Sequence, residues 1–140
     1  MSYENRGKYN HDGIGRQLLR FDGLEYDDHI TPMDVDAYIE YHDMKRVLIE
    51  VKMKGVKMLW GQRTALERMV NDFTKANKDA IAIVAEHTEF DKGNDVMLAQ
   101  CIIRELYYGK ERRWRPPKHI MTVEQFLRLF LIPPAERKPS

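Results

Sequence analysis

Two neighbouring stretches of the chain alternate apolar and polar residues, and a short polar segment separates them. They are 33–41, MDVDAYIEY, and 45–54, KRVLIEVKMK. A period of two is typical of β-strands, and two such runs in succession predict a hairpin. The second run carries apolar residues on both of its faces, which predicts a strand that is covered on both sides of a sheet.

A helix and a buried strand are predicted next. Residues 61–77, GQRTALERMVNDFTKAN, repeat apolar side chains at helical spacing, and 79–87, DAIAIVAEH, form a nearly continuous apolar run. The first pattern favours an amphipathic helix, and the second favours a strand inside a sheet. The helix stripe consists of Leu66, Met69, Val70 and Phe73.

The last third of the chain predicts one more strand and one more helix. The strand covers 102–108 and ends at a turn around Gly109, and the helix covers 122–132. Thr122 is the expected N-cap, since its hydroxyl can accept a hydrogen bond from a free backbone N–H of the first turn. Pro133 ends this helix because proline cannot continue it.

Upstream, 13–21 predict a short helix and 23–30 a first strand. The chain of 140 residues is long enough for one domain with a full core. We therefore expect a single α/β domain with a mixed central sheet that helices flank. Residues 1–13 and 134–140 lack apolar periodicity and are expected to be flexible.

Glu50 and Lys52 interrupt the apolar strand 45–54 and project from the same face of it. Burying either charge costs free energy unless it is paired, binds a metal or reaches solvent. One interpretation is an ordinary ion pair on a solvated sheet face. The other is a chemical site, which Asp36 on the preceding strand would complete.

The hairpin register decides whether Asp36 can join them. A loop of odd length around 42–44 places Asp36 opposite Glu50, whereas a two-residue turn would put the two carboxylates on opposite faces. Loops of three residues usually need a left-handed conformation, which Asp43 tolerates better than most residues. The site hypothesis therefore requires the odd loop.

The segments ITPMDVDAYIEY, VLIEVKMKG and GQRTALERMV resemble the PD-(D/E)xK, or restriction-endonuclease-like, superfamily, and in particular its small phage and prophage members. The resemblance covers about residues 14 to 87 and implies an α-β-β-β-α-β core. It also implies metal-dependent nuclease activity with Mg²⁺ or Mn²⁺ as the cofactor.

By this resemblance Asp36, Glu50 and Lys52 are the motif residues, and Gln62 matches a helix glutamine of several members. Asp36 and Glu50 would hold the metal, and Lys52 would position or help to activate water. Asp34 is an alternative to Asp36, because it lies on the same face and Pro32 precedes it by two residues.

Two groups of basic residues are candidates for contacts with phosphate. Lys54, Lys57 and Arg63 flank the motif, and a second group surrounds Trp114. Both groups can equally be ordinary basic residues that face solvent. In that interpretation Trp114 packs into the core. The second group consists of Arg112, Arg113 and Arg115.

Composition indicates the compartment in which the protein works better than it indicates its activity. The chain has 23 basic and 22 acidic residues, so it lacks the basic excess of many DNA-binding proteins. Its one cysteine, Cys101, excludes an intramolecular disulfide framework and suits a reducing cytoplasm, which is the host cytoplasm if a phage encodes the chain. Cys101 itself is expected to be buried. No apolar run reaches membrane-spanning length.

The sequence thus predicts a nuclease whose substrate is nucleic acid, with DNA expected before RNA. A homodimer is expected if both strands of a duplex are cut. The alternatives are an inactive nucleic-acid- or protein-binding module on the same fold, and a structural protein in which the three charges form only an ion-pair network.

Overall fold

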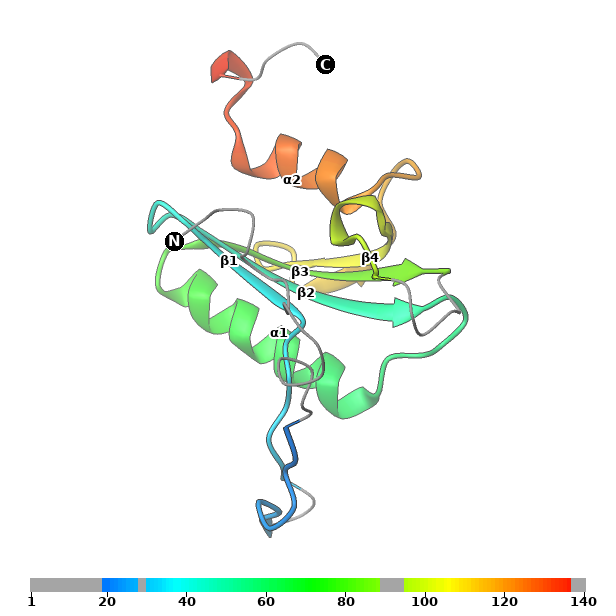
Figure 1. Ribbon diagram of the computed structural model, residues 1–140. Helices are drawn as coiled ribbons and strands as arrows, with labels where there is room; N and C mark the ends of the chain where they lie inside the picture. Colours follow the sequence, from blue (N-terminus) through cyan, green and yellow to red (C-terminus); the bar gives the residue numbers. More distant parts are fainter. Residues whose placement is uncertain (1–18, 28–29, 89–94, 137–140) are drawn as a thin grey trace, which may run out of the picture. The chain divides into compact units, whose positions relative to one another are not determined.

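The computed structural model describes residues 19–27, 30–88 and 95–136 (Figure 1). By their contacts the residues fall into two units, Met1–Met33 and Asp34–Ser140. The helices and strands named here all belong to the second unit. In chain order they are β1 (Ala37–Tyr41), β2 (Lys45–Met53), α1 (Trp60–Lys75), β3 (Asp79–His87), the 3₁₀ helix η4 (Leu98–Gln100), β4 (Ile102–Tyr108), β5 (Arg113–Arg115), α2 (Val123–Leu131) and the 3₁₀ helix η5 (Pro134–Glu136).

The five strands form one mixed sheet in the order β1-β2-β3-β4-β5. Only β2 and β3 run parallel, and α1 connects them; the other three neighbouring pairs are antiparallel. Within this unit α1 and α2 lie on opposite sides of the sheet (Figure 1). The prediction of an α/β fold with a mixed central sheet that helices flank is confirmed.

The hairpin between β1 and β2 has the expected odd loop. Ala37 pairs with Ile49, so paired residue numbers add to an even number, and the loop consists of 42–44. His42 and Asp43 take the left-handed conformation, with φ of 50° and 55°. Ion pairs that tether the Asp43 side chain hold this conformation without a glycine.

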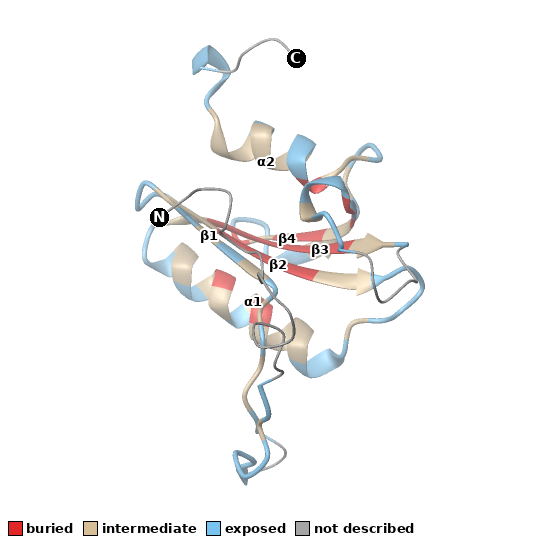
Figure 2. Cartoon of the chain, in the orientation of Figure 1, coloured by how far each residue is buried: buried red, intermediate tan, exposed pale blue. Residues whose placement is uncertain are grey.

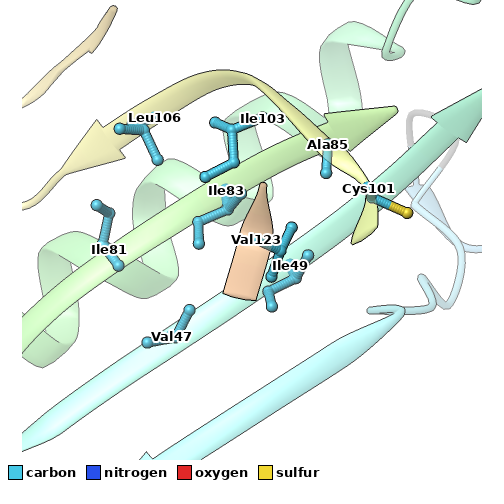
Figure 3. Packing of buried hydrophobic residues seen from close by; sticks show 9 residues of the cluster. All are labelled: Val47, Ile49, Ile81, Ile83, Ala85, Cys101, Ile103, Leu106 and Val123. Atoms are coloured by element: carbon cyan, nitrogen blue, oxygen red, sulfur yellow. The ribbon is translucent and has the colours of Figure 1, made fainter. Parts of the chain in front are cut away.

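A continuous apolar core lies between the sheet and α2 (Figure 3). Alternate residues of β2 and β3 supply it, including Val47, Ile49 and Ile83, and Val123 of α2 closes it from above. Fully burying one such side chain contributes about 1.5–3 kcal/mol. Figure 2 shows that burial concentrates on the central strands. Cys101 is buried in this cluster, as predicted.

The opposite face of the sheet packs against α1. Leu66 and Val70 of α1 are buried there, together with the remaining alternate residues of the central strands, such as Leu48 and Val84. The prediction that β2 is covered on both faces is therefore confirmed. The face that meets α1 is the one that carries Glu50 and Lys52.

Local signals at the ends of α2 are also as expected. The Thr122 hydroxyl accepts a hydrogen bond from the Gln125 N–H at 3.1 Å, and the Gln125 side chain accepts one from the Thr122 N–H at 3.0 Å. This reciprocal capping box satisfies two free donors at the start of the helix. The helix ends at Leu131, two residues before Pro133.

The expected first strand over 23–30 is wrong. The Tyr26 N–H donates to the Ile30 carbonyl at 2.7 Å, so the segment bonds to itself instead of pairing with a neighbouring strand. The helix expected over 13–21 falls mainly outside the described residues, and 19–21 are not helical.

The two ends expected to be flexible are described only in small part. Residues 1–13 and 137–140 lie outside the described residues, and the expected tail begins with the short helix η5. Among the described helices the longest is α1, with 16 residues, and none is long and apolar enough to cross a membrane.

Candidate active site

Asp36 immediately precedes β1. Its side chain adds one hydrogen bond to the pairing between β1 and β2. Its Oδ2 accepts a hydrogen bond from the Val51 N–H at 2.7 Å. The backbone pairing that begins at Ala37 would otherwise leave this donor of β2 without a partner from β1. The bond fixes the carboxylate of an otherwise exposed residue at the edge of β2.

Glu50 is a buried carboxylate in the middle of the sheet. The residue is 5% exposed and pairs in the parallel ladder with Val84 of β3. Continuing the register of β1 and β2 by one step sets Asp36 opposite Glu50. The hairpin therefore brings the two carboxylates to neighbouring positions on the sheet, as the site hypothesis requires.

The surroundings of Glu50 favour its neutral form. Burial raises the pKa of the Glu50 carboxyl above its usual range, and the negative charge of Asp36 raises it further. Hydrogen bonding and attraction from Lys52 and a bond from the Asp36 backbone lower it, without cancelling the increase. A cation placed beside both carboxylates would remove the repulsion between them.

Lys52 links Glu50 to the first turn of α1. Its Nζ lies 3.3 Å from Glu50 Oε1 and donates to Gln62 Oε1 at 3.0 Å. The side chain is 18% exposed, so the ammonium is held against the sheet while it keeps a route to solvent. Gln62, in the first turn of α1, thus fixes the position of the Lys52 ammonium.

The geometry favours Asp36 over Asp34 as the partner of Glu50. The Asp36 charge acts on Glu50 directly, and its carboxylate is oriented by Val51. Asp34 is exposed and lies two residues farther from β1.

The donor set fits a hard divalent cation. Mg²⁺ is commonly bound by one or two carboxylates while it keeps several waters. Asp36 and Glu50 supply two such carboxylates, and the Val51 bond occupies only one oxygen of Asp36. Among the described residues no group of three histidine, cysteine, aspartate or glutamate side chains is placed to hold a metal. The two-carboxylate set therefore leaves the remaining positions to water or substrate.

Of the basic residues predicted near the motif, two are open to solvent. Lys54 and Lys57 are exposed in the connection between β2 and α1. Arg63 instead pairs with Glu105 of β4 through both of its terminal nitrogens and lies 4.5 Å from the ring centre of Trp114. The described structure gives Arg63 an internal role, and its contact with nucleic acid stays a prediction that the geometry does not favour.

The second basic group lies on the hairpin between β4 and β5. The Arg115 guanidinium pairs with Glu111 at 2.9 Å, and Arg113 lies 3.9 Å from the same carboxylate. Arg112 is exposed in a left-handed conformation with φ of 56°. Glu111 neutralises part of this group, so its binding to phosphate also stays a prediction.

Trp114 packs back onto α1. Its Nε1–H donates to Glu67 at 2.6 Å, and its ring lies 5.3 Å from that of Tyr107. These contacts agree with the structural interpretation, in which Trp114 returns to the body of the protein.

Arg104, which no sequence pattern singled out, organises the connection after β2. Its guanidinium donates to Glu86 at 3.0 Å, to the Val56 carbonyl at 2.7 Å and to the Met53 carbonyl at 3.5 Å. The only sequence signal is a single arginine within an apolar strand. Its partners are far away along the chain, so periodicity alone could not identify them.

A separate hollow of about 550 Å³ lies where β2 and β3 begin, at the end of the sheet away from Lys52. Its lysines include Lys78 and Lys110, which pair with Asp43 at 3.0 Å and Asp79 at 3.7 Å. Because these cations are already neutralised, the hollow is a weaker candidate for phosphate chemistry than the carboxylate pair.

No family model, curated protein or solved structure matches this chain. The resemblance to the PD-(D/E)xK superfamily therefore stays a prediction. The chemistry assigned to the site depends on the side chains and distances described above.

Proposed function

We propose that the chain is a metal-dependent phosphodiesterase that hydrolyses nucleic acid, with DNA as the principal substrate. The observation that carries the proposal is the buried Glu50, which pairs with Lys52 on the same face of β2 and is close enough to Asp36 to be affected by its charge. A buried carboxylate with a raised pKa, next to another carboxylate and a lysine, is typical of functional sites. The preference for DNA comes from the sequence resemblance.

Asp36 and Glu50 are the residues that would hold Mg²⁺ or Mn²⁺. Such an ion supplies Lewis-acid chemistry: it neutralises charge on a phosphate and lowers the pKa of a bound water. Burial and, to a smaller extent, repulsion from Asp36 raise the pKa of Glu50. The pair is suited to this task because a cation would relieve that repulsion.

Lys52 would orient the attacking water or balance the charge that develops on the phosphate. A preorganised cation stabilises such charge more in a site with little water than in bulk solvent. The bond to Gln62 holds the ammonium in place and leaves donors available, since an ammonium has three. Gln62 is therefore a positioning residue in this proposal.

A second candidate is a non-catalytic binding module on the same fold. It is favoured by the fact that the Lys52 ammonium is already engaged by both Glu50 and Gln62. In this alternative the three side chains stabilise the packing of α1 on the sheet and perform no chemistry.

Cleavage assays separate the two candidates. The full chain is incubated with single-stranded, duplex, nicked and branched DNA and with RNA, with Mg²⁺, Mn²⁺ or a chelator. We expect cleavage that depends on the metal and is lost in Asp36→Asn and in Glu50→Gln.

Asp79→Asn is the matched control, since Asp79 is another carboxylate of the sheet but lies at the start of β3, at the end of the sheet away from Lys52. It should keep its activity under conditions where it is folded. If the wild-type chain cleaves none of these substrates in the presence of metal, the binding module becomes the favoured function.

A further inference from the structure

Three large apolar side chains are exposed in the connection between β2 and α1 and at the first residue of α1. Val56 is 47% exposed, Leu59 70% and Trp60 77%. A tryptophan is usually largely buried, since its ring is the largest apolar side chain. Sequence analysis missed Trp60, although a Leu-Trp pair at the end of a basic segment was the available signal.

Trp60 lies beside the proposed catalytic residues in the chain. It is the first residue of α1, and Gln62, which binds Lys52, follows in the same helical turn. The ring is therefore anchored to a rigid element that also positions the site. No acidic side chain occupies this first turn, so nothing in it repels a phosphate backbone.

The charged residues that precede Trp60 in the connection after β2 are positive and accessible. Lys54 and Lys57 are exposed, and neither forms an ion pair with a described residue. Many lysines and arginines of the sheet, in contrast, pair with carboxylates. Accessible ammonium groups a few residues before an exposed aromatic ring supply the two chemical elements that bind single strands of nucleic acid.

The connection is also held in place. Arg104 of β4 bonds the carbonyls of Met53 and Val56 and pairs with Glu86. Gly55 turns the chain with φ of 86°, and the Val56 N–H donates to the Met53 carbonyl at 2.9 Å. A ring presented from an anchored segment loses less conformational freedom on binding than one on a loose loop.

We propose that Trp60 stacks on an unpaired base of a nucleic-acid strand whose backbone Lys54 and Lys57 contact. This inference rests on the proposed function, and it specifies a substrate with a single-stranded segment next to the cleaved bond. A fully paired duplex cannot offer the face of a base without disruption, whereas a single strand, flap or frayed end can.

Binding measured without cleavage tests the inference. The full chain in a chelator is titrated with a short fluorescent oligothymidylate and with a blunt duplex of equal length. We expect tighter binding of the single strand, quenching of tryptophan emission, and a loss of about tenfold in single-strand affinity in Trp60→Leu. Trp114, the only other tryptophan, packs against Arg63, so quenching that disappears in Trp60→Leu belongs to Trp60.

Leu59→Ala is the matched control, because it removes an equally exposed apolar side chain from the adjacent position. It should change single-strand affinity less than twofold. Circular dichroism shows whether each variant is folded, which is expected because Trp60 is mostly exposed.

Equal single-strand affinity of the wild type and Trp60→Leu would overturn the inference, as would quenching that depends on protein concentration alone. Single-strand binding through Trp60 without metal-dependent cleavage would preserve the inference and overturn the nuclease proposal. If Trp60→Leu cleaves with metal and keeps the substrate preference of the wild type, the nuclease proposal is preserved and the inference about Trp60 is overturned.

Discussion

Glu50 links the chemistry of the site to the stability of the fold. Its pKa is raised in the folded protein, mainly by burial and then by Asp36. The folded state therefore binds more protons than the unfolded chain at pH values above the ordinary pKa of 4.5. Hence the contribution of Glu50 to the free energy of unfolding is fully present in acid and is lost as the pH rises through the folded pKa.

Glu50→Gln should consequently be more stable than the wild type at neutral pH. We expect a gain of about 1 kcal/mol, or roughly 3 °C in Tm for a chain of this size, measured by thermal unfolding without metal. The gain should diminish as the pH falls through the folded pKa and disappear well below the ordinary pKa of 4.5, where the carboxyl is neutral in both states. Glu86→Gln, which breaks the pair with Arg104, should be less stable instead.

A Glu50→Gln protein less stable than the wild type at pH 7 would mean that the ion pair with Lys52 outweighs the cost of burial. In that case the three charges would be explained by structure alone.

Lys52 should affect turnover more than metal binding. Lys52→Ala is expected to keep its affinity for Mn²⁺ in calorimetric titration but to lose at least a hundredfold in single-turnover cleavage, about 2.7 kcal/mol of barrier. Asp36→Ala should weaken Mn²⁺ binding itself. Lys110→Ala, at the far end of the sheet, is the control. Cleavage at the wild-type rate by Lys52→Ala would reduce Lys52 to a structural partner.

At the scale of elements, Gly109, immediately after β4, packs closely against α1. A β-carbon built there would lie 2.0 Å from the Thr74 hydroxyl oxygen and 3.0 Å from a methyl group of Val70. The Thr74 hydroxyl is held by the Val70 carbonyl at 2.8 Å, so it can yield only by losing a bond. The sequence predicted a turn at Gly109 but gave no sign of this packing.

Gly109→Ala should therefore destabilise the protein by about 1–3 kcal/mol, as measured by urea unfolding. Gly61→Ala is the matched substitution: a β-carbon at Gly61 of α1 meets nothing within 4 Å. It should stabilise the protein by about 0.5–1 kcal/mol, because alanine favours a helix over glycine. Equal effects of the two substitutions would contradict the packing described for Gly109.

The elements that periodicity predicted well are those whose pattern and pairing are local. The strand predicted over 33–41 forms β1 but begins only at Ala37, the strand over 45–54 forms β2, and the odd loop set the register. The prediction of a strand over 23–30 is wrong. Its composition permits a strand, but Tyr26 bridges to Ile30 of the same segment. Propensity does not reveal which edge a strand meets.

The candidate site was predictable to a similar extent and for the same reason. Spacing alone placed Glu50 and Lys52 on one face, and the register brought in Asp36. The partner of Arg63 and the anchoring by Arg104 come from β4, which is more than forty residues away from Arg63 and from the carbonyls that Arg104 binds. Such contacts depend on tertiary structure, which one sequence does not show.

At the scale of the whole molecule, a net charge of +1 limits long-range attraction to nucleic acid. Binding should then depend on a few local contacts with phosphate. In Lys54→Ala/Lys57→Ala the slope of log K against log salt for a single strand should fall by about 1.4, or 0.7 for each lysine. Lys75→Ala/Lys78→Ala, at the other end of α1, is the control. An unchanged slope in the first variant would exclude both lysines from the contact.

The antiparallel hairpin of β1 and β2 and the first turn of α1 contain every residue of the proposed site, from Asp36 to Gln62. During folding, contacts between residues near in sequence form with little loss of chain entropy, whereas β4 must close a long loop. The chemical arrangement should therefore be organised before Arg104 and Glu105 arrive to secure it. Pulse-labelled hydrogen exchange would then show protection of the Val51 amide before that of the Leu106 amide, and the reverse order would mean that the sheet forms from its other side.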